Sequence, residues 1–234
     1  MTAQSPRIGI IGTGAIGGFY GLMLARAGFD VRFLLRSEYA AVSEQGLHLN
    51  STVHGPLHLH PVQAYARAAD MPPCDWLLVG TKSTGNVDLA PTIAQVAAPD
   101  AKVVLLQNGL DVEDSLREYL PASLHLLGGL CYIGVHRSAP GVIEHQALGR
   151  VNLGYHSGTA ANDEDAQKAI VEAGAALFHA GRHRVPGHGQ CASGPLAQTG
   201  VERALQWPLR VARYRHHGDD GRRIQPRADP GADG

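Results

Sequence analysis

The 234-residue sequence predicts an α/β chain built around a doubly wound parallel sheet. Short apolar runs rich in β-branched residues alternate along the chain with segments of helical periodicity, which is the pattern of consecutive βαβ units. The first run, at 7–11, leads directly into a glycine-rich turn and then into a helical segment. Because this alternation continues well into the second half of the chain, we expect residues 1–160 to form one such unit.

The glycines after the first strand have the spacing G-x-G-x-x-G. In a dinucleotide-binding turn the first of them, Gly12, permits the tight turn, Gly14 lets the backbone approach a pyrophosphate, and Gly17 lets the next helix pack closely on the strand. That helix, expected at 15–27, would direct its N-terminal amides at the phosphates. A glycine-rich turn without a ligand is the alternative, but the position between strand and helix favours cofactor binding in a Rossmann-like domain. The segment expected to contact the cofactor comprises Gly12, Thr13, Gly14, Ala15, Ile16 and Gly17.

The second strand, at 30–35, ends in Arg36 and Ser37. Sites that prefer NAD usually carry an Asp or Glu at this point, which accepts a hydrogen bond from the ribose 2′-hydroxyl. A guanidinium instead pairs with a 2′-phosphate, which a carboxylate would repel. Arg36 therefore favours NADP, and an ordinary solvated arginine at a strand end is the alternative.

Residues 38–60 read as a short helix, at 38–45, followed by a small hairpin of 47–50 with 57–60. His58 and His60 would share one face of a strand, with His54 nearby. A metal site is conceivable, but no carboxylate or cysteine completes it, so we interpret the three as surface histidines.

The next two strands, at 75–80 and 102–106, each end in polar residues, and a helix is expected between them at 86–96. Lys82 follows the first of these strands and Asn108 the second. Ligands of doubly wound sheets bind outside the carboxyl ends of the strands, so both residues are candidates for the cofactor site. A loop lysine and a plain Asn-Gly turn are the alternatives.

The following segment predicts less regular structure. A long apolar run at 124–135 is broken by two glycines, and two short strands are expected at 142–145 and 151–154. An amphipathic helix is then expected at 163–179, capped by Asn162 and with Ala166, Ile170, Ala173 and Leu177 on its apolar face.

Taken together, these motifs resemble the ketopantoate reductase family over about residues 7–180. The matching features are the glycine turn, the strand-end Arg36, Lys82 after the run at 77–81, Gln107-Asn-Gly109, and the segment 141–145 leading to 149–154. The resemblance implies an NADPH-dependent enzyme that reduces a small 2-keto acid, ketopantoate, to pantoate on the route to coenzyme A. It also implies that Lys82 lies by the cofactor, and that Asn108 contacts both the nicotinamide side and the substrate as a catalytic residue.

Members of that family also use a lysine from a helical C-terminal domain, in a pattern close to W-x-K-L-x-x-N-x-x-x-N, to protonate the ketone oxygen. Here the last lysine is Lys168. Residues 161–181 read as the first helix of that domain, whereas 182–234 form an irregular tail rich in Arg, Gly and Pro. The sequence thus predicts a truncated or disrupted helical domain. The alternatives are therefore an inactive or non-catalytic NADP-binding product, or a reductase of a related 2-keto acid.

We interpret the tail as an out-of-frame version of the family's C-terminal domain. When the last two bases of each codon are joined to the first base of the next, Trp207-Pro208 must give Gly, Gln206-Trp207 gives Asn or Ser, and Gln198-Thr199 gives Lys or Arg. One consistent choice of codons turns 195–208 into R-W-R-K-L-V-W-N-V-P-F-N-G. This contains the lysine and the asparagines in order and at the family's spacing.

Composition excludes several other classes. The formal net charge of −1 gives no case for nucleic-acid or membrane partners, although the basic run at 210–217 would suit a nucleic-acid-binding arm if the tail were read at face value. No apolar run approaches the roughly 18 residues of a membrane span, and the N-terminus lacks the basic region of a signal peptide, so we expect a cytoplasmic protein. Cys74, Cys131 and Cys191 share no metal or redox spacing and read as incidental thiols. The sequence does not predict the oligomeric state.

Overall fold

A computed structural model describes residues 5–109 and 111–182 of the chain. The strands are β1 Arg7–Ile11, β2 Asp30–Leu34, β3 Leu47–Ser51, β4 Leu57–Leu59, β5 Ala64–Tyr65, β6 Cys74–Val79, β7 Ala97–Leu105, β8 His125–Ala139 and β9 Val142–Ser157. The α-helices are α1 Ala15–Arg26, α2 Tyr39–Gln45, α3 Asn86–Val96, α4 Val112–Arg117 and α5 Glu164–Arg182, and the 3-10 turns are η1 Ala68–Asp70 and η2 Ser83–Gly85. Of the tail predicted at 182–234, only Arg182, the last residue of α5, belongs to the described residues.

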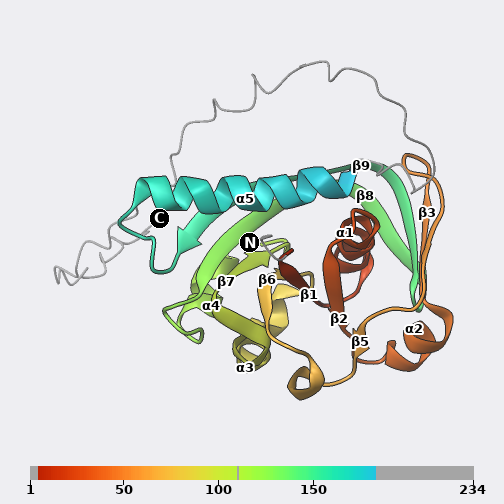
Figure 1. The fold of residues 1–234 in the computed structure, drawn as a ribbon, viewed down its shortest axis with the longest axis horizontal. Helices are drawn as coiled ribbons and strands as arrows, with labels where there is room; N and C mark the ends of the chain where they lie inside the picture. Colours follow the sequence, from red (N-terminus) through yellow and green to blue (C-terminus); the bar gives the residue numbers. More distant parts are fainter. Residues whose placement is uncertain (1–4, 110, 183–234) are drawn as a thin grey trace, which may run out of the picture. The chain divides into compact units, whose positions relative to one another are not determined.

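Within the described residues, all of these strands join one sheet in the order β4-β3-β9-β8-β7-β6-β1-β2-β5 (Figure 1). From β5 to β8 every neighbouring pair is parallel, and β1 lies between β2 and β6. Ile8 and Ile10 of β1 are fully buried, as expected for a strand covered on both faces. The predicted doubly wound parallel sheet is therefore confirmed.

Helices cover both faces of this sheet (Figure 1). On one face α1 and α5 pack on the strands in a core that includes Phe19, Phe33 and Phe178. On the other face α3 and α4 pack in a second core that includes Ile93 and Leu116. Helix α1 is buried along its whole middle, so it lies pressed between the sheet and α5.

Strands β8 and β9 form one long antiparallel hairpin, which corrects the expectation of an apolar run followed by two short strands. The two expected strands at 142–145 and 151–154 are parts of the continuous strand β9. The interruption in the sequence pattern has a local cause, since Leu148 and Gly149 have φ of 69° and 110° and the register with β8 shifts beside them. Irregularities of this kind bend a strand without ending it.

The N-terminus of β9 also pairs with β3, whose other neighbour is β4. His48 lies opposite Val142 in the parallel pair, and Leu47 lies opposite Leu59 in the antiparallel pair. The small hairpin that the sequence predicts at 47–60 is therefore confirmed. It adds β3 and β4 to the sheet beyond β9, at the edge opposite β5.

Helix α5 follows the predicted bounds closely, with two corrections. Asp163, and not Asn162, caps its N-terminus, because the Ala166 backbone N–H donates to Asp163 Oδ1 at 3.0 Å. Ala173 is exposed, and the buried stripe passes instead through Gly174 and Leu177. The helix packs on β9 and α1, so its apolar face is covered by the parallel unit.

Two of the cysteines lie in the described part of the chain and carry free thiols. Burial raises the pKa of Cys74 and of Cys131 to about 11, so little of either thiol is ionised at neutral pH. This is consistent with the interpretation of these two as incidental thiols, while Cys191 lies outside the described residues.

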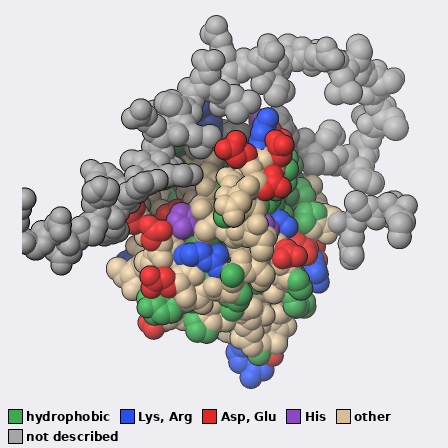
Figure 2. All heavy atoms as spheres, turned by 90° about the vertical axis from the view of Figure 1, so that its left-hand side faces the viewer, with side chains coloured by type: hydrophobic (Ala, Val, Ile, Leu, Met, Phe, Trp, Pro, Cys, Tyr) green, Lys and Arg blue, Asp and Glu red, His purple; other side chains and the backbone are tan. Residues whose placement is uncertain are grey.

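The surface in Figure 2 carries acidic and basic side chains interspersed with hydrophobic ones. Neither sign of charge dominates that face. Among the helices in the described ranges, none is long and apolar enough to cross a membrane.

His145 on β9 is a buried histidine whose two ring nitrogens both have partners. Its Nε2 lies 3.1 Å from the Ala147 carbonyl oxygen, to which it must donate, and its Nδ1 lies 2.8 Å from Ser51 Oγ, from which it then accepts. The ring packs on Phe19 with a centroid distance of 4.4 Å. The neutral imidazole satisfies both contacts, and burial lowers the pKa of His145 below its ordinary value.

We expect His145 to make the protein less stable in acid. Because its folded-state pKa is depressed, neutral His145 makes its full contribution to the free energy of unfolding above the unfolded-state pKa of about 6.5. This contribution is lost as the pH falls from there toward the folded-state pKa, by at most about 1.4 kcal/mol per pH unit. Urea unfolding between pH 7.5 and 5.5 measures this, and His145→Gln should flatten the dependence. Exposed His136→Gln is the matched control on the same hairpin, and identical pH dependence in all three proteins would contradict the prediction.

Candidate dinucleotide-binding site

A cavity of about 460 Å³ opens at the carboxyl ends of β1, β2 and β6. This is the edge at which ligands of doubly wound sheets bind. Its walls come from the β1–α1 turn, the β2–α2 loop, the segment that follows β5, the β6–α3 loop, helix α3 and one residue of β8. The lining residues are Ile11, Gly12, Thr13, Leu34, Leu35, Arg36, Ser37, Glu38, Ala66, Ala68, Thr81, Lys82, Thr84, Gly85, Leu89, Thr92 and Arg137.

Two of the three motif glycines are required by the backbone packing of the β1–α1 turn. Gly12 has φ of +87°, and a Cβ there would lie 2.8 Å from the backbone nitrogen of Thr81. At Gly17 a Cβ would lie 2.2 Å from the Gly12 carbonyl oxygen. Side chains larger than hydrogen are therefore excluded where the turn, α1 and the end of β6 converge.

Gly14 is different, because no heavy atom lies within 4 Å of a Cβ built there. It is the N-cap residue of α1 and offers no side-chain cap, so the first-turn amides, including those of Ala15 and Ile16, are left for another acceptor. Beside it, Thr13 Oγ1 is buried without a hydrogen-bond partner among the described residues. A pyrophosphate group would fit this open space and would accept hydrogen bonds from the free backbone amides and from the Thr13 hydroxyl.

Arg36 stands at the end of β2, on the cavity wall, with an exposed side chain. Lys82, which follows β6, is exposed on the same cavity. Within the described ranges neither side chain forms an ion pair, so both charges remain available to an anion. The cavity is cationic on balance, since Arg36, Lys82 and Arg137 face it and Glu38 is its one acidic lining residue in the described chain.

Asn108 does not line this cavity but lies on a neighbouring loop. It follows β7 and is exposed, and its backbone carbonyl oxygen accepts a hydrogen bond of 3.5 Å from Ser83 Oγ. The structure thus brings Gly12, Thr13, Arg36 and Lys82 to one cavity, with Gly14 to Gly17 at its helix end. Asn108 lies next to the Lys82 loop, one strand further along the sheet.

Comparison with known proteins identifies the family. A family model described as ketopantoate reductase PanE/ApbA matches residues 8–158. The chain belongs to this family. The match covers the strands and helices that build the cavity, together with the β8–β9 hairpin.

Curated members of the ketopantoate reductase family align with the same part of the chain. A 2-dehydropantoate 2-reductase from a Nostoc species is 41% identical over 148 residues, which is 63% of this chain and 46% of that protein. One from Pyrococcus abyssi is 30% identical over 152 residues, covering 64% of this chain and 48% of its own length. The chain therefore spans about half the length of the curated relatives that it matches.

Solved structures agree with these alignments. The 2-dehydropantoate 2-reductase of Geobacter metallireducens superposes with a TM-score of 0.66 at 31% identity, over 76% of this chain and 56% of that one. That of Methylococcus capsulatus gives 0.64 at 33% identity, over 75% and 55%. The family's fold is thus reproduced across most of the described residues.

The site also contains a pair of hydrogen-bonded amides, buried Asn86 and half-buried Gln107, that the sequence did not reveal. Gln107 Nε2 donates to Asn86 Oδ1 at 2.7 Å, and Asn86 Nδ2 donates back to Gln107 Oε1 at 3.0 Å. Gln107 Nε2 also lies 3.1 Å from Thr81 Oγ1. These bonds tie the loop that carries Lys82 to the loop that carries Asn108. The only sequence signals were that Gln107 follows a strand and that Asn86 begins an expected helix.

Glu38 and Arg137 form the second feature that sequence reasoning missed. Glu38 was expected only as the first residue of a short helix, and no element was predicted for the stretch that contains Arg137. In the structure they form an ion pair on the cavity wall. Nothing in the local pattern links two residues so far apart in the chain, and only the pairing of β8 with β9 and of β9 with β3 brings them together.

Proposed function

We propose that this chain supplies the NADPH-binding part of an enzyme that reduces 2-dehydropantoate to pantoate. The observation that carries the proposal is the cavity at the carboxyl ends of β1, β2 and β6, where the glycine turn lies together with Arg36, which forms no ion pair within the described residues. Membership of the ketopantoate reductase family supports the same activity.

The residues present fit a nicotinamide dinucleotide. The space above Gly14, the amides of the first turn of α1 and the Thr13 hydroxyl suit the pyrophosphate. Arg36 suits the 2′-phosphate that distinguishes NADPH from NADH. No free carboxylate competes for that position among the residues described, since Glu38 is engaged by Arg137. NADP as the cofactor is therefore the specific form of the proposal.

When bound, the cofactor would supply a hydride to the keto carbon. The chain's own residues would then hold the substrate and cofactor in place. Lys82, which has no ion-pair partner in 5–109 and 111–182, offers its charge to anionic groups on its side of the cavity, and Asn108 offers an amide one strand further along. The Asn86–Gln107 pair holds the loops of Lys82 and Asn108 in place, which would reduce the conformational entropy that these loops lose on binding.

A ketone that accepts a hydride also needs a proton on its oxygen. The family resemblance implies that a lysine in the C-terminal domain donates this proton. We propose that the DNA encoding residues 182–234 encodes that domain in another reading frame. Sequencing the DNA across the codons for 175–210 tests the hypothesis. A single-base insertion or deletion there would support it, and an unchanged sequence would contradict it.

Turnover and binding separate the enzyme from a non-catalytic NADPH-binding module. We expect the purified chain to bind NADPH, and the frame-corrected chain to oxidise it in the presence of ketopantoate. The decrease in NADPH absorbance measures this, with several other 2-keto acids compared in parallel. Faster turnover of another keto acid would identify a different substrate, and binding without turnover in the corrected chain would show that the enzymatic proposal is wrong.

A further inference from the structure

Glu38 is a buried carboxylate two residues beyond Arg36. Its side chain is only 10% exposed, and both oxygens are occupied by the β8–β9 hairpin. Oε1 pairs with Arg137 Nη1, and Oε2 accepts a 3.1 Å hydrogen bond from the Gly141 backbone N–H. A carboxylate so close to Arg36 would otherwise pair with it or repel a phosphate, so these contacts remove it from competition.

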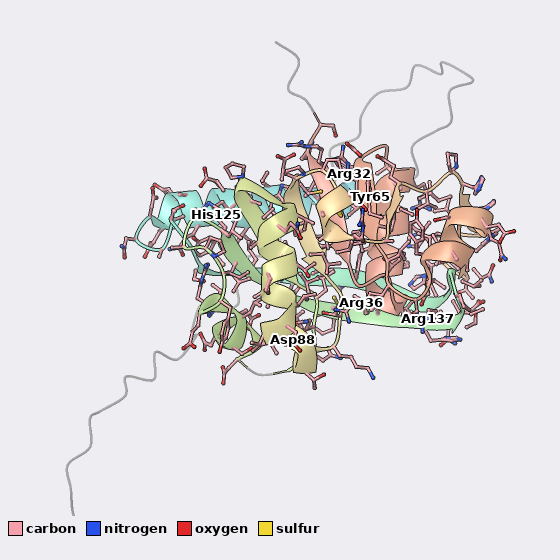
Figure 3. The ribbon with its side chains drawn as sticks, turned by 90° about the horizontal axis from the view of Figure 1, so that it is seen from below. Arg32, Arg36, Tyr65, Asp88, His125 and Arg137 are labelled. Atoms are coloured by element: carbon pink, nitrogen blue, oxygen red, sulfur yellow. The ribbon has the colours of Figure 1, made fainter. Side chains whose placement is uncertain are left out.

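Arg137 is less buried than its partner. Its side chain is 47% exposed, and it lines the same cavity as Arg36. Figure 3 shows the two labelled arginines on the same side of the molecule, Arg36 at the end of β2 and Arg137 on β8. A guanidinium has five N–H donors, and the contact with Glu38 uses one edge of it. The remaining donors can therefore meet a ligand in the cavity.

We propose that Arg137 is a second specificity-determining residue for the adenosine 2′-phosphate, acting beside Arg36 and held in position by Glu38. The inference rests on the proposed function, because it concerns the same cofactor. Two guanidiniums from different elements can hold one phosphate from two sides, which a single exposed arginine cannot do. The Glu38 contact would keep Arg137 aimed at the cavity before the ligand arrives, which lowers the entropy lost on binding.

Two adenosine nucleotides that differ only in the 2′-phosphate test this on the full chain. Isothermal titration calorimetry with 2′,5′-ADP and with 5′-AMP gives the preference for the 2′-phosphate. In R137Q we expect 2′,5′-ADP to bind about tenfold more weakly, the loss of one charge-assisted contact, while 5′-AMP binding changes less than about twofold. R150Q removes an exposed arginine from the same hairpin outside the cavity, and it should leave both affinities unchanged.

Removing Arg137 leaves Glu38 charged and buried, so R137Q could unfold. The double variant E38Q/R137Q removes that unpaired charge and should fold with the same loss of preference. E38Q alone keeps Arg137 but removes the ionic contact that positions it, so it should weaken 2′,5′-ADP binding by less than R137Q does and leave 5′-AMP binding unchanged.

Three outcomes would overturn the inference. If E38Q and R137Q weaken both nucleotides equally, the ion pair only braces the loop. If Arg36→Ala abolishes the preference while both R137Q and the double variant retain it, Arg137 does not contact the phosphate and the NADPH proposal still stands. A wild-type chain with no preference for 2′,5′-ADP would contradict the NADPH proposal itself, and with it the role of Arg137.

Discussion

Gly17→Ala is expected to destabilise the protein and to abolish dinucleotide binding, whereas Gly14→Ala should abolish binding alone. A Cβ at Gly17 would lie 2.2 Å from the Gly12 carbonyl oxygen and 3.1 Å from Ile10 Cγ2. The nearer atom belongs to the backbone of the β1–α1 turn and cannot rotate away. Helix α1 would have to move off the sheet, and overpacking of this kind costs roughly 1–3 kcal/mol, occasionally more.

At Gly14 the same methyl group would meet no protein atom within 4 Å, and its backbone φ of −77° suits any residue. The stability should therefore stay within about 0.5 kcal/mol of wild type. Binding should fail because the methyl group would occupy the space proposed for the pyrophosphate. Gly17→Ala thus tests the packing of the turn, and Gly14→Ala tests the pyrophosphate site.

Thermal unfolding and the quenching of protein fluorescence by NADPH measure the two effects. Gly154→Ala is the matched control, since that glycine also has open space around it but lies on the β8–β9 hairpin. It should change neither property. Normal NADPH affinity in Gly14→Ala would mean that the dinucleotide does not cross this turn, and the site assignment would have to be abandoned.

The sequence predicted the parallel unit well, because each of its elements carries a local signal. The strands at 7–11 and 75–80 are largely buried apolar runs, which need covering on both faces to fold, and the strand at 30–35 alternates between buried apolar and half-buried residues. The glycine turn could be placed for the same reason, since its spacing reflects the close approach of Gly17 to Gly12. Arg36 and Lys82 then followed from the rule that ligands bind at strand carboxyl ends.

The features of the fold and of the site that the sequence did not predict depend on contacts between residues far apart in the chain. Glu38 and Gly141 are 103 residues apart, and their hydrogen bond exists only because β9 pairs with β3. The long hairpin was missed because the irregular backbone at Leu148 and Gly149 breaks the alternation that predicts a strand. The amide pair of Asn86 and Gln107 spans two loops whose separation no periodicity encodes.

Arg36→Ala is expected to weaken NADPH binding by about 10- to 100-fold and NADH binding by less than about threefold. The guanidinium is proposed to meet the 2′-phosphate, which only NADPH carries, and one or two charge-assisted hydrogen bonds are worth about 1.5–3 kcal/mol. Because Arg36 is exposed and has no ion-pair partner among the described residues, its removal should leave the fold intact. Titration of the wild type and the variant with both nucleotides gives the four affinities needed.

Arg67→Ala is the control for the loss of one positive charge near the cavity. Arg67 lies between the lining residues Ala66 and Ala68, but its guanidinium is engaged by Asp70 at 2.8 Å. Its removal should change the affinities for NADPH and NADH by the same factor.

The 2′-phosphate contact of Arg36 should also weaken with ionic strength, since it lies at the surface. The preference for NADPH should therefore fall between 50 mM and 500 mM salt. Equal losses for both nucleotides in Arg36→Ala would show that Arg36 does not read the 2′-phosphate, and the preference for NADPH would then have to come from another part of the cavity.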